Sequence, residues 1–107
     1  MAENVREVNG KELKALIEEG KTVVCDFWAA WCMPCRMVAP VIDKLAGEFK
    51  SRAEFVKLNI DEDPETAAEY MVMSIPDVFV FQNGSKKAHS LGFAPEEELR
   101  EFFSENI

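Results

Sequence analysis

The sequence of 107 residues predicts an α/β fold, with a central mixed β-sheet of about five strands flanked by about four helices. Residues 21–29 form an apolar run without polar alternation, which is typical of a strand covered on both faces. A helical pattern and a second strand-like run follow it, as in a βαβ unit. Near the end of the chain, two strand-like runs flank an Asn-Gly pair, which is the strongest short signal for a hairpin.

Length and composition are those of one globular domain, and we expect residues 1–107 to form it. Hydrophobic residues make up 48% of the chain and charged residues 30%, which excludes the disordered and membrane-spanning classes. A chain of this size buries roughly 60–65% of the surface that its unfolded form exposes, so it needs no disulfide in order to fold. Its three cysteines are therefore free for chemistry.

The formal net charge of −8 excludes two classes of partner. A field of that sign repels phosphate backbones and anionic lipid, so we expect neither nucleic acid nor a membrane as a partner.

The first seven residues are polar and acidic, unlike a signal peptide, and no apolar run approaches the ~18 residues of a membrane span. Three cysteines with one close pair also differ from a secreted disulfide framework. We expect a cytoplasmic monomer.

The first helix is predicted to begin after Asn9, and we expect one strand before it. Asn9 and Glu12 have the spacing of a capping box, and Gly20 ends the helical pattern. The apolar residues of this short surface helix are Leu13, Leu16 and Ile17. The run of residues 21–29 then gives the central strand.

A long helix is predicted for residues 34–50. Its apolar residues follow one stripe and Pro40 predicts a kink. A second strand is expected at residues 55–61, and Asp63 with Pro64 opens a short helix that ends near Met71. The stripe of the long helix consists of Met37, Val38, Val41, Ile42, Leu45 and Phe49.

The last three elements are a hairpin and a helix. Residues 77–81 and 86–91 should be antiparallel strands, since Asn83-Gly84 lies between them. Pro95 begins the last helix, with three glutamates in its first turn. That helix should bury Leu99, Phe102, Phe103 and Ile107. The whole order is β-α-β-α-β-α-β-β-α.

Cys32 and Cys35 are the most informative residues, because two cysteines at this spacing can open and close a disulfide with little backbone movement. Cys32 falls where a strand gives way to a helix, beside free N–H groups and the positive end of the helix dipole. A helix start of this kind lowers the pKa of a thiol, and the thiolate is the nucleophile. The alternatives are two buried thiols or half of a zinc site, for which Cys25 and His89 are poorly placed as further ligands.

Asp26 interrupts the apolar run of the central strand. A carboxylate in such a place costs several kcal/mol unless it is protonated or paired, so we expect a raised pKa. A carboxyl group of that kind suits a proton shuttle. The alternative is a structural acid paired with Lys57 on the adjacent strand.

Several segments in a fixed order cover nearly all of the chain: residues 24–29, 31–36, 39–40, 59–64 and 74–76, Gly84 and Gly92. Taken together, these segments closely resemble the thioredoxin family. The resemblance implies the thioredoxin fold and a protein disulfide reductase, with protein disulfides as substrates and a thioredoxin reductase that recharges it. No Gly-rich nucleotide loop is present, so we expect no bound cofactor beyond the redox-active Cys32–Cys35 disulfide.

The resemblance also implies a role for each matching residue. Cys32 would attack the substrate disulfide and Cys35 would resolve the mixed disulfide. Asp26 would take the proton of Cys35 through water, with Lys57 modulating its charge. Pro76 would be a cis-proline beside the dithiol.

A rim around the sulfur atoms would then bind the substrate, with ordinary packing as the alternative for each member. Trp28 is expected to support the site from behind rather than to contact the substrate. The members of the rim are Trp31, Met33, Pro34, Ile75, Gly92 and Phe93.

Four residues depart from the family's usual pattern. The family usually has glycine at Met33 and Met71, threonine at Asp77 and lysine at Arg36. Met33 should stiffen the first helical turn, since glycine is a poor helix former. Asp77 is either an anion near Cys32 that opposes the thiolate, which would make the protein a stronger reductant, or a solvent-facing residue without effect.

Two further residues are expected to be bystanders. Cys25 should be inert core, because its side chain points to the face opposite Asp26. His89 should be solvated or satisfied by a neighbour. Two other functions compete with a reductase: a binding module whose dithiol is incidental, and an oxidant or isomerase of the same fold.

Overall fold

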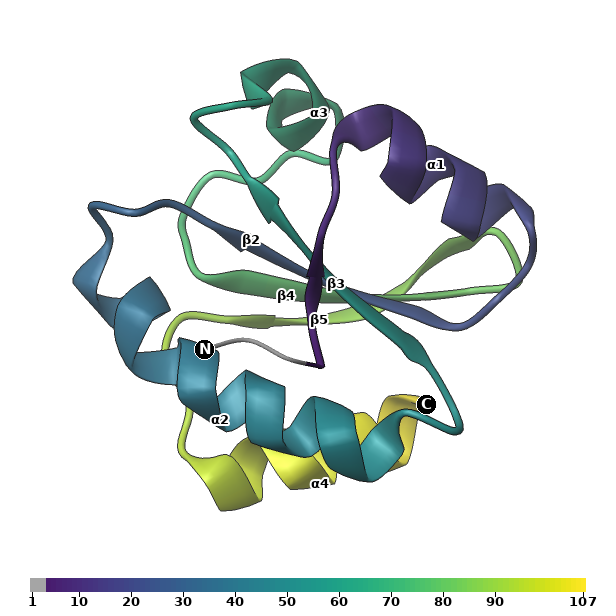
Figure 1. Cartoon of the computed structure of the whole chain (residues 1–107), viewed down its shortest axis with the longest axis vertical. Helices are drawn as coiled ribbons and strands as arrows, with labels where there is room; N and C mark the ends of the chain where they lie inside the picture. The colour runs from purple at the N-terminus through teal and green to yellow at the C-terminus, as the bar shows by residue number, and fades with distance from the viewer. Residues whose placement is uncertain (1–3) are drawn as a thin grey trace.

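The computed structural model describes residues 4–107 and contains a five-stranded mixed sheet with helices on both faces (Figure 1). The predicted fold class and element order are confirmed. Residues 1–3, the first part of the acidic segment considered above, lie outside the described residues. The elements are β1 (Arg6–Glu7), α1 (Gly10–Glu18), β2 (Val23–Trp28), α2 (Met33–Phe49), β3 (Glu54–Asn59), α3 (Pro64–Glu69), β4 (Asp77–Gln82), β5 (Ser85–Leu91) and α4 (Glu96–Asn106).

β2 is the middle strand of the sheet, whose order is β1-β3-β2-β4-β5. It runs parallel to β3 on one side and antiparallel to β4 on the other. β1 is parallel to β3, and β5 is antiparallel to β4. A strand in the middle of a sheet covered on both faces needs apolar residues at both parities, which explains why this run of the sequence lacks polar alternation.

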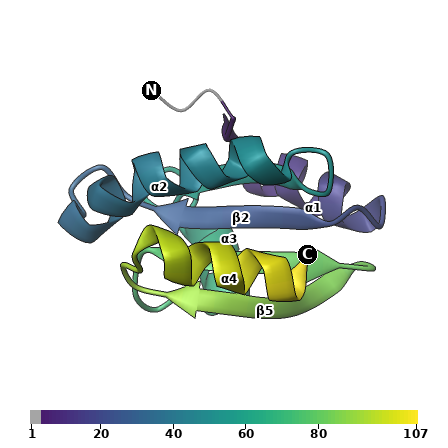
Figure 2. The ribbon, with the colours of Figure 1, turned by 90° about the horizontal axis from the view of Figure 1, so that it is seen from below.

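Two helices cover each face of the sheet. α1 and α3 lie on one face and α2 and α4 on the other, where they run side by side (Figures 1 and 2). Alternate residues of β2 therefore enter different cores: Val24 packs with α2 and α4, whereas Cys25 packs with α1. Asp26 has the parity of Val24, so it faces the layer of α2 and α4.

α2 begins at Met33, one residue earlier than predicted, and continues through Pro40. Met37, predicted to belong to its buried stripe, is instead 54% exposed, so that assignment is wrong. It precedes Val38 by one residue, a rotation of about 100° about the helix axis that places it on the flank of the helix. The residues of α2 that enter the core below the dithiol are Val38, Ile42, Leu45, Ala46 and Phe49.

α1 and α3 are connected through their N-terminal caps. The capping box predicted for α1 is confirmed, with the Asn9 side chain accepting a hydrogen bond from Glu12 N at 2.8 Å and the Glu12 side chain accepting one from Asn9 N at 2.9 Å. Asp63 caps α3 by accepting from Thr66 N at 3.1 Å. Its other oxygen accepts from Gly10 N, at the start of α1, at 2.7 Å. One carboxylate thus satisfies backbone donors of two helices.

The predicted hairpin between β4 and β5 is confirmed. Asn83 and Gly84 form its two-residue loop, with φ of +53° and +86°. Positive φ at both central residues is the requirement of the hairpin turn that favours Asn-Gly. The last helix begins at Glu96 with Pro95 as its N-cap.

α3 ends at Glu69, two residues before the predicted end near Met71. Met71 has φ of +58°, the left-handed region, which ends the helical geometry. A residue with a Cβ atom is strained there, and Met71 is well exposed, so little packing compensates for the strain.

Met71→Gly should therefore raise the free energy of unfolding by about 1 kcal/mol, because glycine adopts this φ without strain. Urea denaturation followed by circular dichroism measures the change. Met73→Gly is the matched control, since Met73 is also exposed but has no positive φ. The control should lose a few tenths of a kcal/mol through the added freedom of the unfolded chain. An equal effect of the two substitutions would contradict the explanation.

Candidate active site

The dithiol lies at the N-terminus of α2, in the turn that follows the end of β2. Cys32 is the N-cap residue, and its sulfur atom is bonded to that of Cys35 as a disulfide, with the two Cα atoms 5.2 Å apart. Cys32 Sγ accepts a hydrogen bond from Cys35 N at 3.2 Å. A sulfur atom at an N-cap therefore meets a backbone donor and the positive end of the helix dipole, both of which favour a thiolate there.

Both cysteines are nearly buried in the disulfide form. Cys32 is 4% exposed and Cys35 is 2% exposed, so exposure alone hardly distinguishes them. Their positions do distinguish them, because Cys32 precedes the helix whereas Cys35 lies within its first turn.

A cis-proline loop faces the disulfide. The Ile75–Pro76 peptide bond is cis, and the carbonyl oxygen of Ile75 lies 3.7 Å from Cys32 Sγ. The carbonyl of Pro76 accepts a hydrogen bond from Gly92 N at 2.7 Å, which joins this loop to the segment after β5. Gly92 has φ of +84°, a conformation that favours glycine. The cis-proline loop thus contacts Cys32 and is itself joined to the segment after β5.

Several rim residues predicted from the sequence are exposed apolar side chains. Trp31 is 69% exposed, and Met33 and Phe93 are also exposed. Pro34 is exposed as well, whereas Ile75 is half-buried and packs against the two cysteines. Further exposed apolar side chains, which the sequence did not assign to the rim, are Met37, Met71, Met73 and Leu91.

Asp61 holds Trp31 in place, a contact that sequence reasoning missed. Asp61 Oδ2 accepts a hydrogen bond from Trp31 Nε1 at 2.8 Å. Asp61 is itself fixed, because its backbone N–H donates to the side chain of Asn59 at 2.9 Å. The segment of residues 59–64 contributes to the family resemblance, but nothing in its spacing connects Asp61 with a tryptophan thirty residues earlier.

Asp26 is a buried carboxyl group, only 4% exposed, on the face of β2 covered by α2. Burial raises its pKa to about 7, while Lys57 opposes this rise and Glu7 and Asp77 add to it. Its Oδ1 atom has no hydrogen-bond partner among the described residues. Near neutral pH this group can therefore either hold or accept a proton.

Lys57 lies beside Asp26 in the register of β2 and β3. Its ammonium is 4.8 Å from the centroid of the Trp28 ring, in a cation–π arrangement. None of the ion pairs within 4.0 Å in residues 4–107 joins Lys57 to Asp26. Lys57 thus acts on Asp26 through space. The alternative, in which Asp26 is a structural acid paired with Lys57, would require an ion pair that is not present among these residues.

Asp77 is 3% exposed, so the expectation of a solvent-facing residue is wrong. Its Oδ1 lies 2.9 Å from Nδ1 of His89, which is thereby satisfied. Burial raises the pKa of Asp77, and His89 opposes that rise. Asp77 pairs with Phe27 in the sheet and therefore lies on the face opposite Asp26. An influence of Asp77 on Cys32 stays a prediction.

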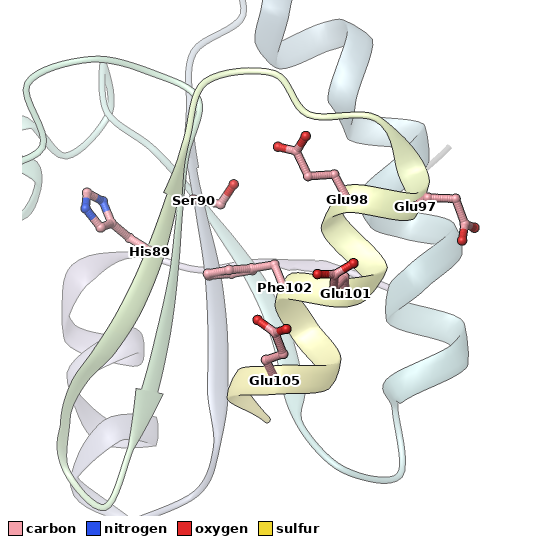
Figure 3. Close-up of a pocket in the computed structure, with 7 residues that line it drawn as sticks. All are labelled: His89, Ser90, Glu97, Glu98, Glu101, Phe102 and Glu105. Carbon is pink, nitrogen blue, oxygen red and sulfur yellow. The ribbon is translucent and has the colours of Figure 1, made fainter.

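A hollow of about 540 Å³ lies between β5 and α4, away from the dithiol (Figure 3). Figure 3 shows the His89 ring on the side of β5 away from α4, so this ring faces Asp77 rather than the hollow. Four glutamates line the hollow and make it negatively charged. Its lining residues are His89, Ser90, Glu97, Glu98, Glu101, Phe102 and Glu105.

Two further features of residues 4–107 bear on the site. No helix within this range is both long and apolar enough to cross a bilayer, and no three His, Cys, Asp or Glu side chains gather there as a metal site. Cys25 is fully buried, and burial raises the pKa of its thiol well above the ordinary value. The third cysteine is thus unreactive in the folded protein.

Comparisons with known proteins agree with this geometry. The family model described as Thioredoxin matches residues 4–105. A thioredoxin from Staphylococcus epidermidis RP62A is 44% identical over 100 residues, covering 94% of this chain and 95% of that protein. A thioredoxin from Staphylococcus aureus Mu50 is 42% identical over the same shares of the two chains.

The raised pKa of Asp26 makes stability depend on pH. The folded protein holds this proton up to about pH 7, whereas an unfolded aspartate releases it near pH 3.9. The free energy of unfolding should therefore fall as pH rises between these values, by roughly 4 kcal/mol in total.

Asp26→Asn does not ionise, so its stability advantage over the parent should grow by about 4 kcal/mol between pH 4 and pH 8. Urea denaturation of the two oxidised proteins across this range measures the gap. Glu101→Gln, on the exposed side of α4, is the control and should show no comparable gap. A gap for Asp26→Asn that stays constant with pH would mean that the buried carboxyl group titrates as in the unfolded chain.

Proposed function

Because this chain belongs to the thioredoxin family and carries a Cys32–Cys35 disulfide, it is a thiol–disulfide oxidoreductase, and we propose that Asp26, Lys57 and Pro76 complete its catalytic site. Its activity is reversible dithiol–disulfide exchange, in which the reduced form reduces disulfides of protein substrates. The observation that carries the proposal is the position of Cys32, at a helix N-cap and 3.7 Å from the Ile75 carbonyl.

In the first step, the Cys32 thiolate attacks one sulfur atom of the substrate disulfide. The substrate disulfide bond breaks, a mixed disulfide forms on Cys32, and the released substrate sulfur takes up a proton. The N–H of Cys35 and the dipole of α2 stabilise the thiolate before attack. Cys32 is proposed as the nucleophile because it precedes the helix.

In the second step, Cys35 resolves the mixed disulfide. Asp26 takes the proton of the Cys35 thiol, and the resulting thiolate attacks Cys32 Sγ. The second substrate sulfur leaves and is protonated, so two electrons and two protons have passed to the substrate. A pKa of about 7 lets Asp26 accept this proton at neutral pH and release it afterwards.

We propose that an extended segment of the substrate lies along the cis-proline loop. The Pro76 carbonyl is already occupied by Gly92 N, whereas the Ile75 carbonyl points at the dithiol and is free to accept a backbone hydrogen bond. The proposed substrate-binding residues are Trp31, Met33, Pro34, Ile75, Gly92 and Phe93.

The remaining expectations concern partners and location. The proposed source of electrons is a thioredoxin reductase, and the proposed location is the cytoplasm, where a reducing environment keeps such a dithiol reduced. We also propose a single domain spanning residues 1–107 that works as a monomer without a resident cofactor. The net charge of −8 disfavours nucleic acid and anionic membranes as partners.

The order of the two attacks can be tested by trapping. Cys35→Ser should retain substrate proteins on Cys32 as stable mixed disulfides, since the resolving thiol is missing. Mass spectrometry after reductive elution identifies them. Cys32→Ser is the matched control and should trap little, because Cys35 lies within the helix. Stronger trapping by Cys32→Ser than by Cys35→Ser would reverse the assigned roles.

The role of Asp26 can be tested by stopped-flow kinetics at pH 7. Asp26→Asn should slow resolution of a preformed mixed disulfide about tenfold or more, because general-base assistance to Cys35 is lost. Attack by Cys32 on the substrate should change much less, which makes the first step an internal control. An unchanged resolution rate would rule out the shuttle.

A further inference from the structure

We propose that Glu7, on the edge strand β1, is a positioning residue for Asp26: its charge attracts the Lys57 ammonium through space toward the edge of the sheet, so that Lys57 neutralises Asp26 only in part. The inference rests on the proposed function of Asp26 as the proton acceptor for Cys35.

The three charged residues form one row across the sheet. Glu7 is the register partner of Lys57 in the parallel pair β1–β3, and Lys57 is the register partner of Asp26 in the parallel pair β2–β3. Register partners point to the same face of a sheet, here the face covered by α2. Neighbouring strands are about 4.8 Å apart, so about 10 Å of sheet separates Glu7 from Asp26 with Lys57 between them.

The three residues of this row differ in their exposure to solvent. Glu7 is exposed at the edge of the sheet, whereas Asp26 is buried in its centre. The Lys57 ammonium lies over the Trp28 ring, which offers a cation a favourable surface. Among residues 4–107 it forms no ion pair within 4.0 Å with either Asp26 or Glu7. A mobile four-carbon side chain with a carboxylate on each side can move toward either one.

Trp28 gives the Glu7 carboxylate a second favourable neighbour. Its indole Nε1 is buried without a hydrogen-bond partner among the described residues, and this N–H group favours the ionised form of Glu7. Burial raises the pKa of Glu7, while Lys57, then the Asn59 backbone and then Trp28 oppose the rise. Lys57 and the Trp28 indole therefore both attract the carboxylate at this edge.

The effect of Glu7 on Asp26 has a definite sign. The negative charge of Glu7 raises the pKa of Asp26 directly, and a Lys57 ammonium drawn toward Glu7 would oppose that rise less effectively. Removing the charge of Glu7 should lower the pKa of Asp26 by both routes. The other charged groups in reach are Glu62, which acts on Glu7, and Asp77, which acts on Asp26 from the opposite face.

The experiment uses Glu7→Gln in the full chain, which keeps the shape of the side chain and removes its charge. The pKa of Asp26 is read from the ¹³C resonance of its carboxyl group in the oxidised protein. It should fall from about 7 by about 0.5, the size expected for one charge at about 10 Å with partial solvent screening. The pH midpoint of mixed-disulfide resolution should fall by the same amount.

Glu54→Gln is the matched control. Glu54 lies on β3 outside the row and pairs with Arg6 of the edge strand β1, so this variant removes one carboxylate from the same side of the sheet. Its effect on the pKa of Asp26 should be less than half that of Glu7→Gln. Equal shifts in the two variants, or no shift in Glu7→Gln, would overturn the proposal.

The Lys57→Met background separates the two routes. There the ammonium is absent, so Glu7→Gln should shift the pKa of Asp26 by less than it does when Lys57 is present. An undiminished shift would overturn the positioning role and leave a direct charge effect alone. These titrations do not depend on catalysis. If Asp26→Asn leaves resolution unchanged, the shuttle fails, whereas the role of Glu7 is decided by the pKa values.

Discussion

The central position of β2 constrains every reactive group of the site. Because β2 pairs on both sides and is covered on both faces, its residues are buried at both parities, and a carboxyl group at position 26 has no access to bulk water. The same strand ends at the turn that carries Cys32 to the N-terminus of α2. The position of β2 therefore determines both where the dithiol lies relative to the sheet and how strongly Asp26 is desolvated.

Burial of Asp26 has a free-energy cost that a folded protein would ordinarily avoid. An apolar residue in its place would join the core of α2 and α4 without a desolvation penalty. The penalty raises the pKa of the group to about 7, and in the proposed mechanism this is a compromise between stability and activity. The charges of Lys57 and Glu7 respectively oppose and add to the rise that burial causes.

The sequence predicted features that depend on neighbouring residues and missed those that depend on the assembled sheet. The capping box at Asn9 and the Asn83 turn follow local rules, and both are present. Met37 fits the helical period, but the period does not say how wide a stripe the sheet covers. The contact of Asp77 with His89 needs the register of β4 and β5, which contains an irregularity that no local pattern announces. The row that includes Glu7 likewise needs the strand order.

The exposed methionines at the N-terminus of α2 and before the cis-proline loop have a mechanical consequence. A thioether side chain is unbranched, has three rotatable bonds and is easily polarised, so it reshapes itself against an irregular surface. Met33 on α2 and Met73 before Ile75 give the surroundings of a rigid disulfide a deformable apolar surface. A reactive pair fixed by the backbone is thus surrounded by side chains that can change shape. Oxidation of these thioethers would make that surface polar while Cys25 stays protected in the core.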